Sequence, residues 1–219
     1  MQTDDFLDAV KKDESPRILQ LLEAQPSLAN SRDKDGVSAV LLALYRGNKK
    51  AAQEIASRKR DLDVFEAAAL GLSQLKTLVD HDVSLVRSYS PDGFTALALA
   101  SYLGQKESAE YLLDKGADLD ASAKNETGYT ALTGAVSQNH NEVVKLLLKK
   151  GANVNHQYEG GFTPLMHAAF AGNVELVNLL LEKGADPNAR NGEGKTPLTF
   201  AREKGHDSVV ELLRKRGAE

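Results

Sequence analysis

Residues Gly161 to Asp186 read GFTPLMHAAFAGNVELVNLLLEKGAD. The phrase that opens this stretch, G-x-T-x-L, occurs four times in the chain. Its threonines are spaced by 35, 33 and 33 residues, and an alanine follows each of them by five places. A period of this length indicates that the chain repeats one small structural unit. The four threonines are Thr95, Thr130, Thr163 and Thr196.

Each unit has the signals of two consecutive helices. The hydroxyl of Thr163 can accept a free backbone N–H as a helix cap, and Pro164 suits the first helical position because its missing N–H costs nothing there. Ala168 is small where a paired helix is expected to cross. Gly172, replaced by Asn139 in another copy, lies where the chain must adopt a left-handed conformation before the second apolar run.

This pattern resembles the ankyrin repeat, because the period, the turn, the T-P-L phrase, the central alanine, the second helix and a closing GAD or GAN all occur in order. The resemblance implies an all-α solenoid of stacked helix pairs with short projecting β-hairpin loops. It also implies a non-catalytic protein–protein interaction module, which binds its partner on one concave surface formed by the hairpin tips and the first helices. One departure is Met166, which stands where the family carries histidine, with His167 one place later.

Three weaker copies extend the pattern upstream, with Ser38, Asp63 and Asp4 in the capping place. Phe6 and Ala9 take the core positions of the first copy. We therefore predict seven helix pairs in a single domain, residues 1–219. Its parts are an N-terminal cap (1–35), degenerate repeats (36–92), well-marked repeats (93–194) and a C-terminal cap (195–219).

Two hairpins are expected to depart from the regular length. Asp63 follows Ser38 by only 25 positions, so the hairpin between these copies must be missing or reduced to a tight link. Because the stability of a solenoid is roughly a sum of repeat and interface terms, we expect a weak junction near Asp61, with residues 36–80 opening before residues 130–215. A hairpin enlarged by two residues is expected at Ala121 to Gly128.

Gly194-Lys195-Thr196 matches the end of a nucleotide-binding P-loop, G-x-x-x-x-G-K-[ST]. The first glycine of that motif is missing, since Ala189 stands in its place, and no apolar strand precedes it. We therefore interpret the triplet as a turn followed by a helix cap. A nucleotide-dependent enzyme that uses Gly194 to Thr196 is kept as the alternative hypothesis.

The histidines do not form a metal-binding or catalytic pattern. None of the five lies at a ligand spacing such as H-E-x-x-H, and they fall in different parts of different repeats. His206 holds a place where ankyrin repeats commonly carry a structural histidine. We predict no catalytic residue, no metal site and no cofactor. The five are His81, His140, His156, His167 and His206.

Composition narrows the class of protein further. The chain has 219 residues, no cysteine and a net charge of −4, with acidic and basic residues interspersed. Disulfides and thiolate metal sites are therefore excluded, and the charge favours neither nucleic acid nor an anionic membrane as a partner. No apolar stretch has the length of a signal peptide or of a membrane span. We expect a cytoplasmic protein that is monomeric on its own.

The aromatic residues suggest where a partner would bind. Three stand directly before a capping threonine, three stand seven places after a capping residue, and two lie in the hairpins. These eight map to the expected concave side, and Arg46 and Leu103 adjoin two of them. An exposed row of aromatic side chains is typical of a surface that a partner covers. The predicted partner-binding residues are Tyr45, Arg46, Tyr89, Phe94, Tyr102, Leu103, Tyr129, Tyr158, Phe162 and Phe170.

A packing role is the alternative for the three rings before the threonines, which can stiffen the stack against the adjacent hairpin. For Tyr45, Tyr102 and Phe170 we expect exposed rings whose replacement by alanine leaves stability nearly unchanged. The other aromatic residues (Phe6, Phe65, Tyr111 and Phe200) are expected to face neighbouring helices. On this basis we predict an adaptor or regulator, with a permanent structural subunit of a larger assembly as a third possibility.

Overall fold

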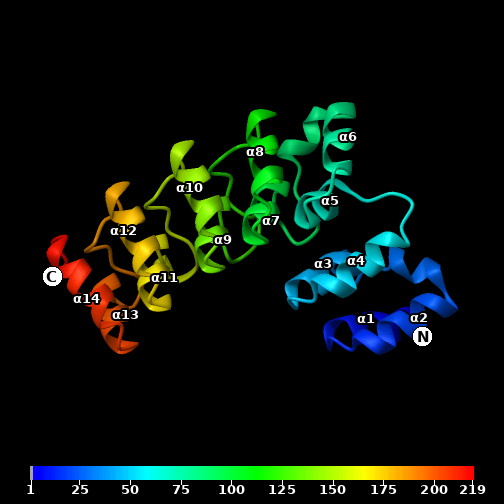
Figure 1. Cartoon of the computed structure of the whole chain (residues 1–219), viewed down its shortest axis with the longest axis horizontal. Helices are drawn as coiled ribbons and strands as arrows, with labels where there is room; N and C mark the ends of the chain where they lie inside the picture. The colour runs from blue at the N-terminus through cyan, green and yellow to red at the C-terminus, as the bar shows by residue number, and fades with distance from the viewer. Residues whose placement is uncertain (1) are drawn as a thin grey trace.

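The computed structural model describes residues 2–219, which form seven helix pairs stacked in an arc (Figure 1). We call the first helix of each pair the inner helix and the second the outer helix, because α5–α14 place them on the inside and outside of the arc. The predicted all-α solenoid is confirmed. The inner helices are α1 (Gln2–Lys11), α3 (Ala39–Tyr45), α5 (Val64–Leu70), α7 (Ala96–Tyr102), α9 (Ala131–Ser137), α11 (Pro164–Ala171) and α13 (Pro197–Glu203). The outer helices are α2 (Ser15–Ala24), α4 (Lys49–Ser57), α6 (Gln74–His81), α8 (Lys106–Asp114), α10 (Asn141–Lys149), α12 (Val174–Glu182) and α14 (Asp207–Lys215).

The repeated threonines cap the inner helices as predicted. Thr163 Oγ1 accepts the backbone N–H of Met166 at 3.3 Å, and the other three threonines make the same bond to the residue three places on. Ser38 and Asp63 do likewise for α3 and α5. The expectation for Asp4 is wrong, because α1 already begins at Gln2 and Asp4 therefore lies within its first turn.

The turn inside each pair has the expected backbone. Gly172 adopts φ 72° and Asn139, which replaces glycine, adopts φ 57°. The ring of His206 lies over Gly172, where an added Cβ would come within 2.7 Å of it. His206 Nε2 also lies 3.0 Å from the backbone oxygen of Phe170. This histidine therefore joins the last two repeats, which is the structural role predicted for it.

The loops between pairs, which we call fingers, are joined to one another by backbone hydrogen bonds. Three of them are closed by a single antiparallel bridge: Arg32 with Ser38, Tyr89 with Thr95 and Tyr158 with Phe162. The expected hairpins are thus very short, because only one bridge forms in each. Bonds between fingers run from Lys124 N to Gly93 O (2.8 Å), from Glu159 N to Thr127 O (3.0 Å) and from Gly192 N to Gly160 O (2.8 Å).

The third repeat has no finger. Residues 58–63 run directly from α4 to α5, and none of the β-bridges within residues 2–219 lies there. The finger of the fourth repeat (88–95) consequently reaches that of the second repeat (31–38). A Cβ placed on Gly36 would lie only 3.1 Å from the Cβ of Pro91, so the two fingers are in contact.

The buried side chains form two clusters that meet at this junction. One extends from Phe6 to Leu99, and the other from Val64 to Leu213. The partly buried Phe65 packs against both clusters. Phe6 and Phe200 are buried, and Phe65 and Tyr111 are half-buried. Tyr111 faces the neighbouring helix α6 as expected, because its hydroxyl donates to Asp80.

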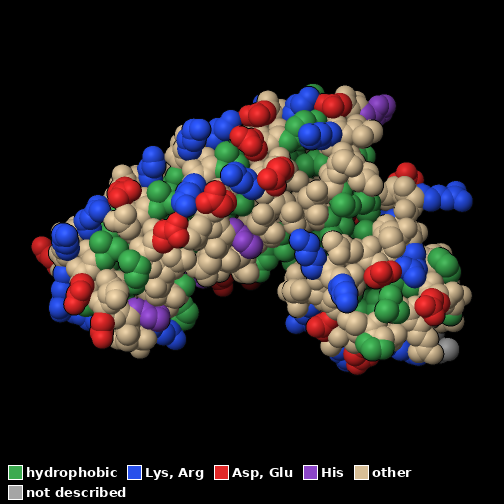
Figure 2. Space-filling view, viewed as in Figure 1, with side chains coloured by type: hydrophobic (Ala, Val, Ile, Leu, Met, Phe, Trp, Pro, Cys, Tyr) green, Lys and Arg blue, Asp and Glu red, His purple; other side chains and the backbone are tan. Residues whose placement is uncertain are grey.

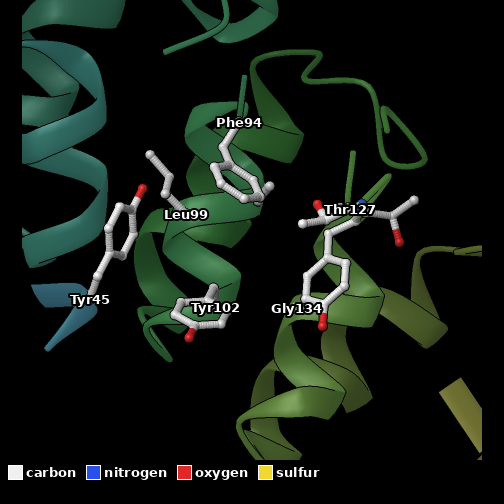
Figure 3. Close-up of a pocket in the computed structure, with 9 residues that line it drawn as sticks. Tyr45, Phe94, Leu99, Tyr102, Thr127 and Gly134 are labelled. Atoms are coloured by element: carbon white, nitrogen blue, oxygen red, sulfur yellow. Dashed lines mark hydrogen bonds between the residues drawn. The ribbon is translucent and has the colours of Figure 1, made fainter. Parts of the chain in front are cut away.

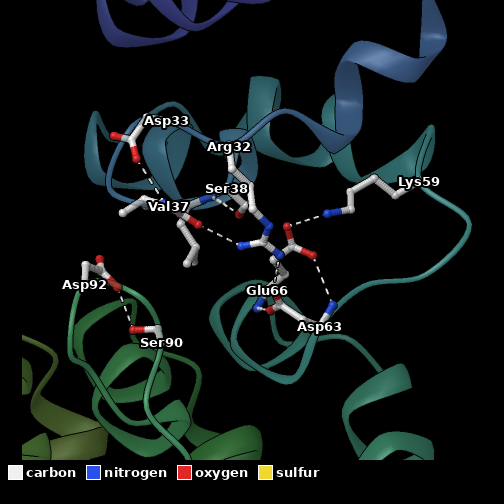
Figure 4. A network of polar contacts seen from close by, with 11 residues as sticks. Arg32, Asp33, Val37, Ser38, Lys59, Asp63, Glu66, Ser90 and Asp92 are labelled. Atoms are coloured by element: carbon white, nitrogen blue, oxygen red, sulfur yellow. Dashed lines mark hydrogen bonds and ion pairs between the residues drawn. The ribbon is translucent and has the colours of Figure 1, made fainter.

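The link before α5 is held by charged groups (Figure 4). Lys59 Nζ lies 2.7 Å from Glu66 Oε1, and both side chains are almost fully buried, with 6% and 0% exposed. Glu66 Oε2 also accepts the backbone N–H of Asp63. Asp63 in turn pairs with Arg32 of the second finger at 2.8 Å. A buried ion pair therefore fixes the segment that replaces the missing finger.

Ion pairs also follow the outer edge of the solenoid, where Figure 2 shows basic and acidic side chains alternating. They join consecutive outer helices, as in Lys115 with Asp80 and Lys145 with Glu175. Exposed pairs of this kind contribute little stability, about 0–1 kcal/mol each. The outer surface is thus occupied by charges that neutralise one another.

A variant at Lys59 tests the predicted weak junction near Asp61. Replacing Lys59 by methionine leaves the Glu66 carboxylate buried without its counter-charge, which typically costs about 3–5 kcal/mol. We expect residues 36–80 to exchange amide hydrogens faster than residues 130–215, and Lys59→Met to widen the difference. The double variant Lys59→Met with Glu66→Gln removes both charges and keeps the acceptor for Asp63. It should recover most of the protection, and a double variant as unprotected as Lys59→Met would contradict this role of the ion pair.

Candidate functional site

The inner side of the arc carries an open apolar pocket of about 250 Å³ (Figure 3). Its walls come from α3, α7 and α9 and from the fingers that precede α7 and α9. We call it the aromatic pocket, because four aromatic rings of the predicted partner-binding set line it. Its residues are Tyr45, Phe94, Ala98, Leu99, Tyr102, Thr127, Tyr129, Thr130 and Gly134.

Gly134 leaves the space for this pocket. It lies four places after the threonine that caps α9. The equivalent position is occupied by Leu99 in α7 and by Phe200 in α13. A Cβ added to Gly134 would lie 3.4 Å from the Cβ of Tyr102, so the two helices approach closely here. Glycine inside a helix costs about 1 kcal/mol relative to alanine. The sequence signal for the pocket is thus this glycine at a core-facing helical position, which our sequence analysis did not single out.

Tyr45 is positioned by a hydrogen bond across the missing finger. Its hydroxyl donates to Asp92 Oδ2 at 2.6 Å, and Asp92 also accepts from Ser90 Oγ. Burial, with the negative charge of Asp92 next in importance, raises the pKa of Tyr45 far above its ordinary value of 10.0. The expectation of a free ring is therefore wrong for Tyr45, which is half-buried and packs against the N-terminal core cluster.

Tyr102 forms the wall between α7 and α9. It is half-buried, and its backbone carbonyl accepts a hydrogen bond from His140. Burial lowers the pKa of His140 in spite of this bond. The neighbouring Leu103 packs against the N-terminal core cluster, whereas Arg46 is exposed beside the pocket.

A second group of aromatic rings continues along the fingers and inner helices toward the C-terminus. Tyr129 of the pocket meets Tyr158 edge to face, with ring centres 4.9 Å apart. Phe162 lies 5.1 Å from Phe200. The packing alternative thus describes Tyr129 and Phe162 correctly, since each ring contacts the ring of an adjacent repeat. Phe170, at 42% exposed, is open to solvent as predicted.

Two predicted residues lie away from this surface. Tyr158 is only 8% exposed, because its ring is enclosed by its neighbours and its hydroxyl lies 3.2 Å from His167 Nδ1. Tyr89 lines a different hollow, together with Gly116 and Asp118, which follow α8 in the chain. Lys124 covers the Tyr89 ring, with Nζ 4.0 Å from the ring centre. The placement of both residues on the open concave side is therefore wrong.

Comparison with known proteins agrees with this architecture. A family model described as ankyrin repeats (3 copies) matches residues 6–123, 64–158, 120–191 and 153–219. The chain belongs to the ankyrin repeat family. Ankyrin repeats are generic protein–protein interaction modules, and the family is generally non-enzymatic.

Curated relatives of this ankyrin repeat protein are much longer than the chain. The rat ankyrin repeat and SAM domain-containing protein 6 is 39% identical over 97 residues, which are 44% of this chain and 11% of that protein. The mouse B-cell lymphoma 3 protein homolog is 32% identical over 146 residues, covering 66% of the chain and 28% of the relative. The bovine ankyrin repeat and SOCS box protein 3 is 31% identical, and the match covers 54% of this chain and 31% of that protein. The matched region thus spans a third or less of each relative.

The P-loop-like triplet of this ankyrin repeat protein is a turn and a helix cap, as interpreted. The backbone N–H of Gly194 donates to Asn191 O, and that of Lys195 donates to Asn191 Oδ1, both at 2.9 Å. Thr196 caps α13, and Lys195 Nζ pairs with Glu203 at 3.1 Å. These donors are therefore engaged within the repeat rather than directed at a phosphate.

Within residues 2–219, three or more histidine or carboxylate side chains nowhere gather in a way that could hold a metal ion. Over the same residues, no helix has the length and apolar character needed to cross a membrane.

Tyr45 and Phe170 are expected to differ in their effect on stability. Tyr45→Ala removes a half-buried ring and leaves Asp92 Oδ2 without the hydroxyl that donates to it, so the free energy of unfolding should fall by about 2–4 kcal/mol. Phe170→Ala removes a ring that is 42% exposed and should cost less than about 1 kcal/mol. Urea denaturation of the two variants measures both values. Equal losses would contradict this assignment of Tyr45 to the fold.

Proposed function

We propose that this ankyrin repeat protein binds another protein on its concave face and acts as an adaptor or regulator without catalysing a reaction. The observation that carries the proposal is the aromatic pocket, an open apolar hollow surrounded by four rings from the second, fourth and fifth repeats. Exposed apolar hollows of this kind are typical of binding sites. The exposed ring of Phe170 extends the apolar surface along the same face.

The size of the aromatic pocket is compatible with one side chain of a larger partner. Its volume of about 250 Å³ lies just below the range of about 300–1,000 Å³ that pockets for drug-sized ligands have. The net charge of −4 argues against nucleic acid, whose binding depends on neutralising phosphates.

The packing of the tyrosine rings within the free chain supports an adaptor rather than a permanent structural subunit. Tyr45 and Tyr129 are packed against their own chain, so the surface is formed before any partner arrives. Permanent interfaces are usually larger and more apolar than a single small pocket. We further propose that the protein is monomeric on its own and cytoplasmic, which a chain without cysteine suits well.

Site-specific photo-cross-linking in the native cell tests this proposal. A benzophenone amino acid replaces Phe170 or Tyr102 on the concave face, and Val83 serves as the control. Val83 is 59% exposed and follows the outer helix α6, so it reports on contacts with the other side of the molecule. We expect the same discrete protein adduct from both concave positions and none from Val83. Adducts only at Val83, or at none of the three positions, would contradict concave-face binding.

A further inference from the structure

We infer that the partner places one aromatic or branched aliphatic side chain in the aromatic pocket and, within two residues of it, an acidic side chain over Arg46 and Lys49. This inference rests on the proposed function, because it specifies the chemistry of the segment bound on the concave face. It follows from two adjoining hollows of different character.

The second hollow, which we call the basic hollow, shares two walls with the aromatic pocket. Tyr45 and Tyr102 line both, so a bound segment can pass from one to the other directly. The basic hollow has a volume of about 360 Å³, and Arg46 and Lys49 are among the residues that line it. It is formed by Leu44, Tyr45, Arg46, Gly47, Lys49, Tyr102, Leu103, Gln105, Gln138 and His140.

The aromatic pocket selects an apolar side chain. Phe94, Leu99 and the rings of the tyrosines present carbon to the cavity, and Tyr45 already donates its hydroxyl hydrogen to Asp92. The absence of a side chain at Gly134 provides depth where α9 passes Tyr102. Burying one aromatic or branched aliphatic group here removes apolar surface from water on both sides of the contact.

The basic hollow selects a negative charge. Arg46 and Lys49 are exposed, and neither forms an ion pair with any residue of the described chain 2–219. By contrast, Lys115 and Lys145 are paired with carboxylates. No aspartate or glutamate belongs to the residues that line the basic hollow. An acidic side chain of the partner would therefore supply the missing counter-charge.

The opposite side of the aromatic pocket is negative, which fixes the side on which the partner's acid lies. Burial, followed by the negative charge of Glu159, raises the pKa of Tyr129. Asp92 lies on the same finger side and holds Tyr45. An acid on the partner is thus repelled from the fingers and attracted to the ends of α3 and α4, where Arg46 and Lys49 lie.

Selection from a phage-displayed library of random ten-residue peptides tests the inference. The bait is the full chain, and the most enriched peptide is synthesised for affinity measurement. We expect enriched peptides to share an aromatic or branched aliphatic residue with Asp or Glu within two positions. Enrichment of peptides without the acid, enrichment of basic peptides, or no enrichment at all would overturn the inference.

Three variants then locate the bound peptide. Gly134→Met fills the aromatic pocket and should weaken binding by about tenfold or more, as expected for loss of a buried anchor. Arg46→Glu with Lys49→Glu reverses the charge of the basic hollow and should weaken binding by a similar factor. Val83→Ala, on the other side of the molecule, lies outside both hollows and should change affinity less than about twofold.

If Gly134→Met folds poorly, reversing the charges of both the protein and the peptide still tests the inference. Both side chains of the Arg46→Glu, Lys49→Glu variant are exposed, so its melting temperature should stay close to that of the native chain. A peptide with lysine in place of its acid should bind this variant better than the original peptide does, and failure of this rescue would overturn the inference. A peptide that is released only by Phe170→Ala would also overturn it, yet would support the proposed function, because binding would then lie elsewhere on the concave face.

Discussion

Asp63 follows Ser38 by only 25 positions, which is too short a distance for an inner helix, a turn, an outer helix and a finger. The chain therefore passes straight from α4 to α5, and the finger of the fourth repeat closes over the gap to contact that of the second. This contact brings Asp92 within 2.6 Å of the Tyr45 hydroxyl. Tyr45 in turn becomes a wall of the aromatic pocket, although it belongs to a helix two repeats away from Tyr102.

The same short link forces charged groups into the interior. Lys59 and Glu66 are buried beside each other where a regular finger would lie, and Glu66 also satisfies the backbone N–H of Asp63. A buried pair of this kind stabilises little relative to apolar residues, but removing one partner is costly. It therefore fixes how the third repeat meets the second without adding much net stability. The two core clusters meet at this point, so the position of α3 relative to α7 depends on it.

Much of the fold could be predicted from the sequence because it depends on local signals. The capping residues Thr163 and Ser38, the left-handed Asn139 and the missing finger before Asp63 are each determined by a few neighbouring residues. The prediction for Asp4 was wrong because aspartate is favoured both as a helix cap and within the first helical turn. The sequence does not distinguish these two neighbouring positions.

The candidate site was predicted less completely, for a different physical reason. A repeat pattern describes contacts between adjacent units, whereas Tyr45 bonds to a residue two repeats on. Its burial could not be inferred from its place in its own helix. Tyr158 is buried by rings from both sides and Tyr89 is turned toward Lys124, which are also tertiary effects. Gly134 creates a space by lacking a side chain, and a glycine in the sequence does not by itself indicate which side chains of other repeats border that space.

Nuclear Overhauser contacts in solution test the central claim, that the second and fourth repeats touch across the missing finger. We predict cross-peaks between the α-protons of Gly36 and the β-protons of Pro91, and between the ring of Tyr45 and the β-protons of Asp92. Selective labelling of proline and tyrosine would make both assignments secure. Contacts of each finger only with the repeats directly before and after it in sequence, and none between Gly36 and Pro91, would contradict the account.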